Sequence, residues 1–181
     1  MEKRIFIGSF VKIDGFDKKY TLIKKEFGGL IKGRWIPEEN FHITYRFIGN
    51  VNPRQLEEIK TVLKPSLGIE YEANLIFRGV GAFPNLLKPR VFFLKVDDTR
   101  GVLDRLNGFV NEKLALLGYP PEKRPFKPHI TLKRVKGYSA EKFQAKVREF
   151  SDYEFGKQAI IKLSIIESIL SPGGAKYKIV E

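Results

Sequence analysis

The sequence contains no cysteine and only two histidines. Without cysteine there is no disulfide framework and no thiolate metal site. Apolar runs long enough to span a bilayer are also missing. Residues 1–8 have too short an apolar run for a secretory signal and no small-residue cleavage site. These absences exclude the disulfide-rich secreted class and predict a cytoplasmic protein.

Signatures of bound metals and nucleoside triphosphates are missing as well. The Walker A pattern GxxxxGK[ST] does not occur. A catalytic zinc usually takes three protein ligands, and no carboxylate stands at a telling spacing from the two histidines. Gly173 and Gly174 predict a hairpin turn rather than a phosphate loop, because no helix follows them. We therefore expect neither a metal nor another cofactor.

Positive charge is in excess. The chain has 181 residues, of which 43% are hydrophobic, and a formal net charge of +12. This length can bury one sizeable core, so we predict a single domain over residues 1–181, pinched into two lobes, and a monomer. The charge is typical of proteins that bind a polyanion such as RNA. The alternative is a basic surface without a function.

Both histidines begin the same short pattern. Residues 41–47 read Phe-His-Ile-Thr-Tyr-Arg-Phe, and residues 128–134 read Pro-His-Ile-Thr-Leu-Lys-Arg. The histidines are 87 residues apart (129 − 42), close to half the chain. With five threonines in the sequence, the chance that both have Thr two places on is roughly one in a thousand. Repetition at half the chain length indicates two related lobes.

Each copy of the pattern predicts a strand, because it is rich in β-branched and aromatic residues with a period of two. Alternate side chains of a strand share a face. The face of each histidine then carries a hydroxyl and a cation: His42, Thr44 and Arg46 in the first copy, and His129, Thr131 and Lys133 in the second. Side by side, two such strands would suit acid–base chemistry on an anionic substrate. Strict alternation turns Arg134 to the opposite face, so a twist or the strand end must bring it inward if it contacts substrate.

The remaining segments predict helices and strands in irregular alternation. Apolar spacing predicts four helices, capped by Asp17, Asn52 and Ser139 and, for the third helix in chain order, opened by Asp98 or Thr99. Period-two or β-branched stretches predict further strands over 4–10, 69–78, 90–96, 158–170 and 175–180. This order indicates an α+β fold of mostly antiparallel strands.

The motifs and their surroundings resemble the 2H phosphoesterase superfamily. The specific likeness is to the RNA 2′,3′-cyclic phosphodiesterase branch, also called the 2′-5′ RNA ligase or LigT-like family. It extends over nearly the whole chain in the expected order, through residues 37–49, 78–84, 89–91, 126–134 and 167–177. The resemblance implies a bilobal α+β fold with two mostly antiparallel sheets, flanking helices, a pseudo-twofold axis and one HxTx motif in each lobe.

The same resemblance implies roles for particular residues. His42 would be the proton donor and His129 the proton acceptor, an order that the residues themselves leave open. Phosphate contacts would come from Thr44, Thr131 and Arg134. Further candidate substrate contacts, which could equally be solvated charges or core aromatic residues, are Arg46, Lys133, Arg78, Arg90, Phe83 and Tyr177. The two aromatic rings would stack on a base.

The expected enzyme is a metal-independent hydrolase that opens RNA 2′,3′-cyclic phosphodiester ends to 2′-phosphomonoesters. An ordinary imidazole pKa near 6.5 allows one ring to be neutral and the other protonated around neutrality. The expected partner is RNA with cyclic phosphate ends, tRNA fragments among them, and no membrane. The alternatives are 2′-5′ ligation by the reverse reaction, a non-catalytic RNA-binding module, and hydrolysis of a small cyclic nucleotide or ADP-ribose cyclic phosphate.

Overall fold

The structure is a computed structural model that describes residues 1–172 and 174–180. Within these residues the strands form two sheets. The four-stranded sheet has the order β3 (His42–Val51), β1 (Lys3–Phe10), β8 (Ser164–Ser171) and β9 (Gly174–Ile179). The five-stranded sheet has the order β2 (Ile31–Trp35), β6 (His129–Tyr138), β5 (Val91–Asp97), β4 (Glu70–Phe83) and β7 (Glu154–Lys162).

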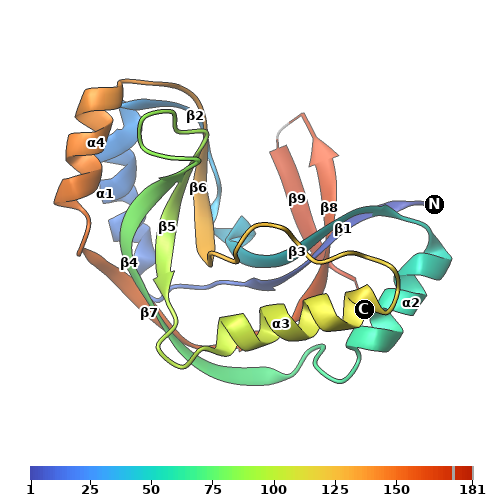
Figure 1. Cartoon of the computed structure of the whole chain (residues 1–181). Helices are drawn as coiled ribbons and strands as arrows, with labels where there is room; N and C mark the ends of the chain where they lie inside the picture. Colours follow the sequence, from blue (N-terminus) through green and yellow to red (C-terminus); the bar gives the residue numbers. More distant parts are fainter. Residues whose placement is uncertain (173, 181) are drawn as a thin grey trace.

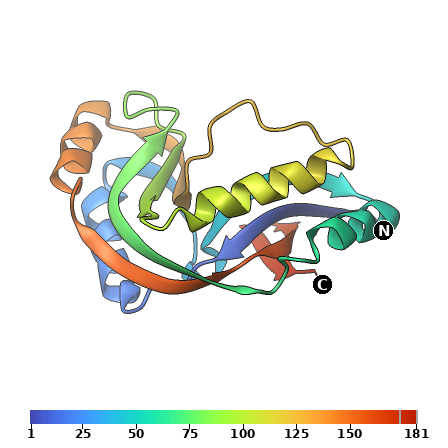
Figure 2. The same cartoon turned by 60° about the horizontal axis from the view of Figure 1, so that its bottom comes forward.

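The four helices form two pairs (Figures 1 and 2). The helices α1 (Phe16–Gly28) and α4 (Ala140–Glu149) contact each other and the five-stranded sheet. The helices α2 (Pro53–Leu63) and α3 (Val102–Ala115) contact each other and β3, and α3 also contacts β4 of the five-stranded sheet. Neighbouring strands in both sheets pair antiparallel. The predicted bilobal α+β fold is confirmed, with one HxTx motif at the start of β3 and the other at the start of β6.

Along the chain, the strands alternate between the two sheets. β1 belongs to the four-stranded sheet, β2 to the five-stranded sheet and β3 again to the four-stranded sheet. The strands β4 to β7 complete the larger sheet, and β8 and β9 return to the smaller one. One continuous hydrophobic cluster includes residues of both sheets and of all four of these helices. None of the helices in the described ranges combines the length and the apolar character needed to cross a membrane.

The start of α2 shows how local sequence sets an element boundary. The Asn52 side chain accepts a hydrogen bond of 2.9 Å from the backbone N–H of Gln55, and the Gln55 side chain accepts one of 2.9 Å from the backbone N–H of Asn52. This capping box satisfies two N–H groups that have no partner within the helix. Pro53 follows the cap at a position where its missing N–H costs nothing. The predicted cap at Asn52 is confirmed.

Other boundaries differ from the expectation. Residues 158–170 do not form one strand, because the chain leaves β7 after Lys162 and enters β8, in the other sheet, at Ser164. The apolar run there carries no glycine or proline that would signal the change. Asp17 lies in the first turn of α1 and is not its cap, a position that Gly15 takes in the left-handed region at φ 63°. The predicted turn at 171–174 includes Gly173, which lies outside the described residues.

Candidate active site

The two histidines are held in the same way. The Nδ1 atom of His42 donates to the carbonyl oxygen of Asn40 at 2.7 Å, and that of His129 donates to the carbonyl oxygen of Lys127 at 2.7 Å. A carbonyl only accepts, so Nδ1 carries the proton in both bonds. In the neutral ring Nε2 is therefore the free acceptor. Each motif thus offers the Nε2 atom of its histidine, which is unprotonated in the neutral ring, as a proton acceptor.

The two imidazoles share one space between the sheets. β3 and β6 are in contact although they belong to different sheets, and the start of β6 lies beside β3 where the lobes join (Figure 1). The charges of His129 and Arg134 both lower the pKa of His42. Since such effects fall off with distance, the three groups lie near one another, and we call the region between them the cleft.

Aromatic rings surround both imidazoles. The ring centroid of His42 lies 4.7 Å from that of Phe6 and 4.7 Å from that of Tyr177, which meets it edge-on. The centroid of His129 lies 4.9 Å from that of Phe83 and 5.2 Å from that of Phe93. Each histidine therefore stands between two aromatic side chains, which shield it from water.

The glycine at position 81 makes room for one of these rings. A Cβ atom at Gly81 would come within 2.8 Å of the Phe93 ring, closer than side-chain carbons approach. Phe93 can therefore lie flat over β4, where it stacks on Phe83 with ring centroids 4.3 Å apart. The absence of a side chain at Gly81 thus helps to build the aromatic wall beside His129.

Burial lowers the pKa of both histidines. Removal from water is the main cause, and for His42 the positive charges of His129 and Arg134 act in the same direction. The pKa of His42 falls to about 4, even though its bond to Asn40 opposes the shift. Both rings are therefore neutral at pH 7 in the free protein, which differs from the expectation of one protonated ring. A bound phosphate would raise both pKa values, because a nearby negative charge favours the protonated form.

A β-bulge changes the direction of the side chains in both motif strands. In β3 the partners of Gly8 and Ile7 are Thr44 and Arg46, so Tyr45 is an extra residue. In β6 the partners of Phe93 and Phe92 are Thr131 and Lys133, so Leu132 is an extra residue. After an extra residue the alternation of faces is reversed.

The predicted positions of Arg46 and Lys133 on the faces of the histidines are consequently wrong. Arg46 is 9% exposed and bonds the segment that follows α3. Lys133 is 3% exposed, donates from Nζ to the carbonyl oxygen of Ile31 at 2.8 Å and lies 4.2 Å from the centroid of the Trp35 ring. Both cations are packed in the interior of the protein and are not available to a substrate in the cleft.

The same bulge brings Arg134 to the cleft. It is exposed, and its charge lowers the pKa of His42 and of Tyr177, which belong to the other sheet. The bulge at Leu132 reverses the faces of the residues after it, and this explains how the Arg134 side chain turns toward the cleft. Desolvation is the larger effect on Tyr177 and raises the pKa of its hydroxyl.

The threonines precede the bulges and keep the predicted faces. The ladder is regular from His42 to Thr44 and from His129 to Thr131, so each hydroxyl lies on the side of its histidine. Both threonines are half-buried. Among the residues that the structure describes, no protein group forms a hydrogen bond with either side-chain oxygen. The two hydroxyls are free to bind a ligand.

The two remaining arginine candidates differ. Arg78 lies on β4, two strands beyond β6, and donates to the Glu154 carboxylate on the edge strand β7 at 3.2 Å. It is therefore engaged away from the histidines. Arg90 is exposed at the start of β5, and its carbonyl oxygen accepts from the Val135 N–H at 2.9 Å, immediately after Arg134. Of the two, only Arg90 lies beside the cleft.

Sequence reasoning missed three residues near the histidines. Phe6 and Phe93 occur in uniformly apolar stretches, so alternation gives no sign that their rings face the cleft. Their absence from the main hydrophobic cluster distinguishes them in the structure. Arg4 lies on β1, and its charge lowers the pKa of Tyr177. It adds a cation near Tyr177 from the four-stranded sheet.

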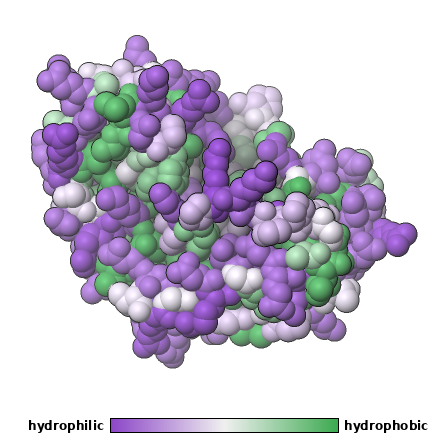
Figure 3. Space-filling model, in the orientation of Figure 1, coloured by the Kyte–Doolittle hydropathy of each residue, from purple (hydrophilic) through white to green (hydrophobic). Residues whose placement is uncertain are grey.

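The surface around the cleft is polar. In Figure 3 hydrophilic side chains gather over the middle of the visible face, where the chain between α3 and β6 crosses from one lobe to the other. Within residues 1–172 and 174–180, no group of three or more His, Asp or Glu side chains is placed to hold a metal ion. The groups that could act on a substrate here are two imidazoles, two hydroxyls and the guanidinium groups of Arg134, Arg90 and Arg4.

Comparison with known proteins gives consistent matches over most of the chain. A sequence profile described as LigT like Phosphoesterase matches residues 14–93 and 94–177. The RNA 2′,3′-cyclic phosphodiesterase of Archaeoglobus fulgidus is 36% identical over 175 residues, which cover 97% of this chain and 96% of the relative. That of Aeropyrum pernix is 40% identical over 147 residues, 79% and 81% of the two chains. The crystal structure of E. coli LigT complexed with 3′-AMP shares the fold, with a TM-score of 0.76, 19% identity and coverage of 100% and 97%.

Proposed function

Because the chain belongs to the LigT like phosphoesterase family, we propose that it is an RNA 2′,3′-cyclic phosphodiesterase that forms 2′-phosphomonoesters. The observation that carries this proposal is the pair of equivalent imidazoles in one cleft, each with its Nδ1 proton donated to a backbone carbonyl. Two free Nε2 atoms can serve the two proton transfers that hydrolysis of a phosphodiester requires.

In the proposed reaction, the neutral Nε2 of His129 accepts a proton from the attacking water. The protonated Nε2 of His42 donates to the departing 3′ oxygen, so the phosphate stays on the 2′ oxygen. This order follows the family resemblance. Binding of the anionic phosphate supplies the protonated His42, because the phosphate charge offsets the burial that lowers the pKa of His42 in the free protein.

The remaining cleft groups would bind the phosphate oxygens. Thr44 and Thr131 each offer a hydroxyl beside a histidine, and Arg134 offers a guanidinium that can hold two oxygens at once. These donors would stabilise the charge that develops on the phosphoryl group in the transition state. Phe83 and Tyr177 stand against the two imidazoles and would place a base by stacking.

RNA is supported as the substrate class by the names of the relatives and by the net charge of +12. We propose that residues 1–181 act as one bilobal unit, because each sheet supplies one histidine. Substrates such as tRNA fragments, a monomeric state and a cytoplasmic location stay predictions.

The proposal is tested with a 2′,3′-cyclic nucleotide and a 2′,3′-cyclic-phosphate RNA oligonucleotide, each in the presence of a chelator. Turnover of both to the 2′-monoester is expected, and chromatography against 2′- and 3′-phosphate standards identifies the product. Formation of the 3′-monoester would contradict the assigned leaving oxygen. Tight RNA binding without turnover would instead identify a binding module. Adding an RNA with a 5′-hydroxyl shows whether ligation competes with hydrolysis.

A further inference from the structure

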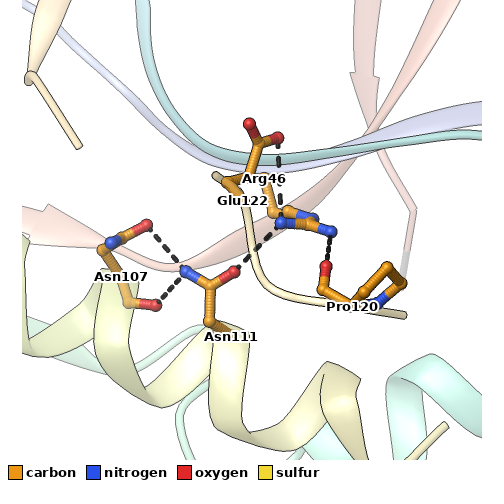
Figure 4. A network of polar contacts seen from close by, with 5 residues as sticks. All are labelled: Arg46, Asn107, Asn111, Pro120 and Glu122. Carbon is orange, nitrogen blue, oxygen red and sulfur yellow. Dashed lines mark hydrogen bonds and ion pairs between the residues drawn. The ribbon is translucent and has the colours of Figure 1, made fainter. Parts of the chain in front are cut away.

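Arg46 holds the segment that leads to the second histidine. Residues 116–128, which we call the linker, join α3 to β6. The Nη2 group of Arg46 donates to the carbonyl oxygen of Pro120 in the linker. Its Nη1 group donates to the side-chain oxygen of Asn111 on α3 at 3.3 Å and lies 3.8 Å from the Glu122 carboxylate (Figure 4). A single buried side chain of β3 thus connects the linker to α3.

Asn111 is itself fixed for this task. Its amide nitrogen donates to the backbone and side-chain oxygens of Asn107, one turn earlier in α3, at 2.9 and 3.1 Å. These bonds leave the Asn111 oxygen turned toward Arg46 (Figure 4). The Glu122 side chain is 49% exposed, so this ion pair adds little. The hydrogen bonds of Arg46 with Pro120 and Asn111 therefore define its position.

The preceding residue of β3 contacts the other end of the linker. The ring of Tyr45 lies 5.8 Å from that of Phe126, centroid to centroid, and the Tyr45 hydroxyl is hydrogen-bonded to Ser9 at 2.9 Å. Tyr45 is the extra residue of the β3 bulge, and the bulge turns Arg46 to the same side. Two consecutive residues of one motif strand therefore contact the linker at two points, Pro120 and Phe126.

The last but one residue of the linker carries the carbonyl group that orients His129. Lys127 supplies the oxygen that accepts from His129 Nδ1, and its side chain is exposed. The equivalent group for His42 has its own anchor, because the side-chain amide of Asn40 donates to the Ala175 carbonyl oxygen on β9 at 2.9 Å. The orientation of His129 depends on the linker, whereas that of His42 does not.

We propose that Arg46 is a positioning residue for His129, so that the strand carrying one histidine fixes the protonation of the other. This inference rests on the proposed function only where it concerns turnover. With the linker held, the Lys127 oxygen keeps the proton of neutral His129 on Nδ1 and leaves Nε2 as an acceptor. Loss of Arg46 removes one of the two contacts between β3 and the linker, and so weakens the bond to Lys127 and allows the proton to move to Nε2. In that tautomer His129 cannot accept a proton from water at Nε2.

The test is the tautomer of each histidine in Arg46→Met, read from imidazole ¹⁵N shifts in the protein without ligand. With only two histidines in the chain, both can be assigned from His→Gln variants. We expect His129 to gain the Nε2-protonated form while His42 keeps its tautomer. For the cyclic nucleotide we expect kcat to fall about 10-fold to 100-fold, with KM changed less than about twofold because Arg46 does not reach the cleft.

Lys133→Met is the matched control. Lys133 is the buried cation in the equivalent position of β6, and it bonds Ile31 rather than the linker. Its replacement should leave the tautomers of both histidines as they are. A change at His42 equal to that at His129 in Arg46→Met would indicate damage to β3 and overturn the proposal. An unchanged His129 tautomer in a folded Arg46→Met protein would overturn it too.

Two milder variants keep the test decisive if Arg46→Met does not fold. Arg46→Lys retains the charge but cannot reach both Pro120 and Asn111, and Asn111→Ala removes one acceptor. Each should shift His129 in the same direction by a smaller amount, and no shift in either would refute the proposal. The tautomers are measured without substrate. Full turnover by His129→Ala would therefore refute the proposed function and leave the positioning result intact.

Discussion

Tyr45 and Leu132 occupy the same place in the two motif strands, three residues after each histidine. Tyr45 has no partner in β1, and Leu132 has no partner in β5. Each bulge reverses which face the following residues occupy. The cation directly after each bulge is buried, and the next residue faces outward. The two lobes therefore repeat a backbone irregularity as well as a motif, but at the outward position one has Phe47 and the other Arg134.

This relationship predicts opposite outcomes for two adjacent cations. Arg134→Gln should lower kcat/KM for a cyclic nucleotide about 100-fold, since a donor to the developing phosphoryl charge is lost. Its free energy of unfolding should change little, because Arg134 is exposed. Steady-state kinetics and urea denaturation measure the two quantities on the same preparation.

Lys133→Met should show the reverse. The Ile31 carbonyl oxygen would lose its buried donor, which costs about 1–3 kcal/mol of the free energy of unfolding. Activity per folded molecule should stay near wild type. An Arg134→Gln protein that turns over normally, beside an inactive Lys133→Met protein, would mean that Lys133 and not Arg134 serves the cleft.

Replacement of either histidine is expected to remove most activity. His42→Ala and His129→Ala should each lower kcat by about 10²–10⁴-fold, the usual contribution of a general acid or base. A weak additional base can be supplied in the buffer, and imidazole should partly rescue the His129→Ala variant. Turnover close to wild type in either alanine variant would exclude the two-histidine mechanism.

The histidine pKa values should separate free and bound protein. In the free protein neither imidazole is expected to titrate at 6.5, because burial lowers the pKa of both and that of His42 to about 4. Bound inorganic phosphate or a 2′-nucleotide should raise both values. NMR titration of the ring protons from pH 3 to 8 measures the shifts. A pKa near 6.5 for His42 in the free protein would show that Phe6 and Tyr177 do not keep water away from its ring.

Burial of His42 also predicts a dependence of stability on pH. Its folded pKa of about 4 lies below its ordinary value of 6.5, so the unfolded chain binds the proton more readily. The neutral ring costs nothing above pH 6.5, and stability falls as the pH drops from 6.5 toward 4. Between pH 7 and pH 5 the loss due to His42 is about 2 kcal/mol. Denaturant titrations should find a smaller loss in His42→Gln.

Tyr177 is expected to control the surroundings of His42. Its ring centroid lies 4.7 Å from that of the imidazole, so Tyr177→Ala should admit water and raise the pKa of His42 toward 6.5. Tyr177→Phe keeps the ring and should leave that pKa low. The comparison isolates the ring from the hydroxyl. If both variants titrate like wild type, Phe6 alone accounts for the shielding.

The sequence predicted what depends on local pattern. The two motif strands, the shared face of each histidine and the next-but-one threonine, and the cap at Asn52 all follow from spacing within a few residues. The bilobal arrangement follows from the family resemblance, and periodicity alone does not predict it. These features need no knowledge of which strand lies beside which.

The features that escaped prediction depend on the neighbouring strands. Nothing in the residues of Tyr45 or Leu132 marks a bulge, because an extra residue exists only relative to the register of β1 or β5. The reversal at each bulge is the reason that strict alternation misplaces Arg46 and Lys133, and it supplies the inward turn that Arg134 requires. In the same way, the run from 158 to 170 has no break residue, and only the pairing shows that it serves two sheets.

The alternation of strands between the sheets has a consequence for any attempt to divide the chain. A break between β5 and α3 would leave β1 and β3 on one piece and β8 and β9 on the other, so neither piece would own a complete sheet. Produced as separate polypeptides, the halves should be obligate partners that regain activity only on reassembly. The repeated motif therefore belongs to two interlocked halves, neither of which is a self-sufficient half-enzyme.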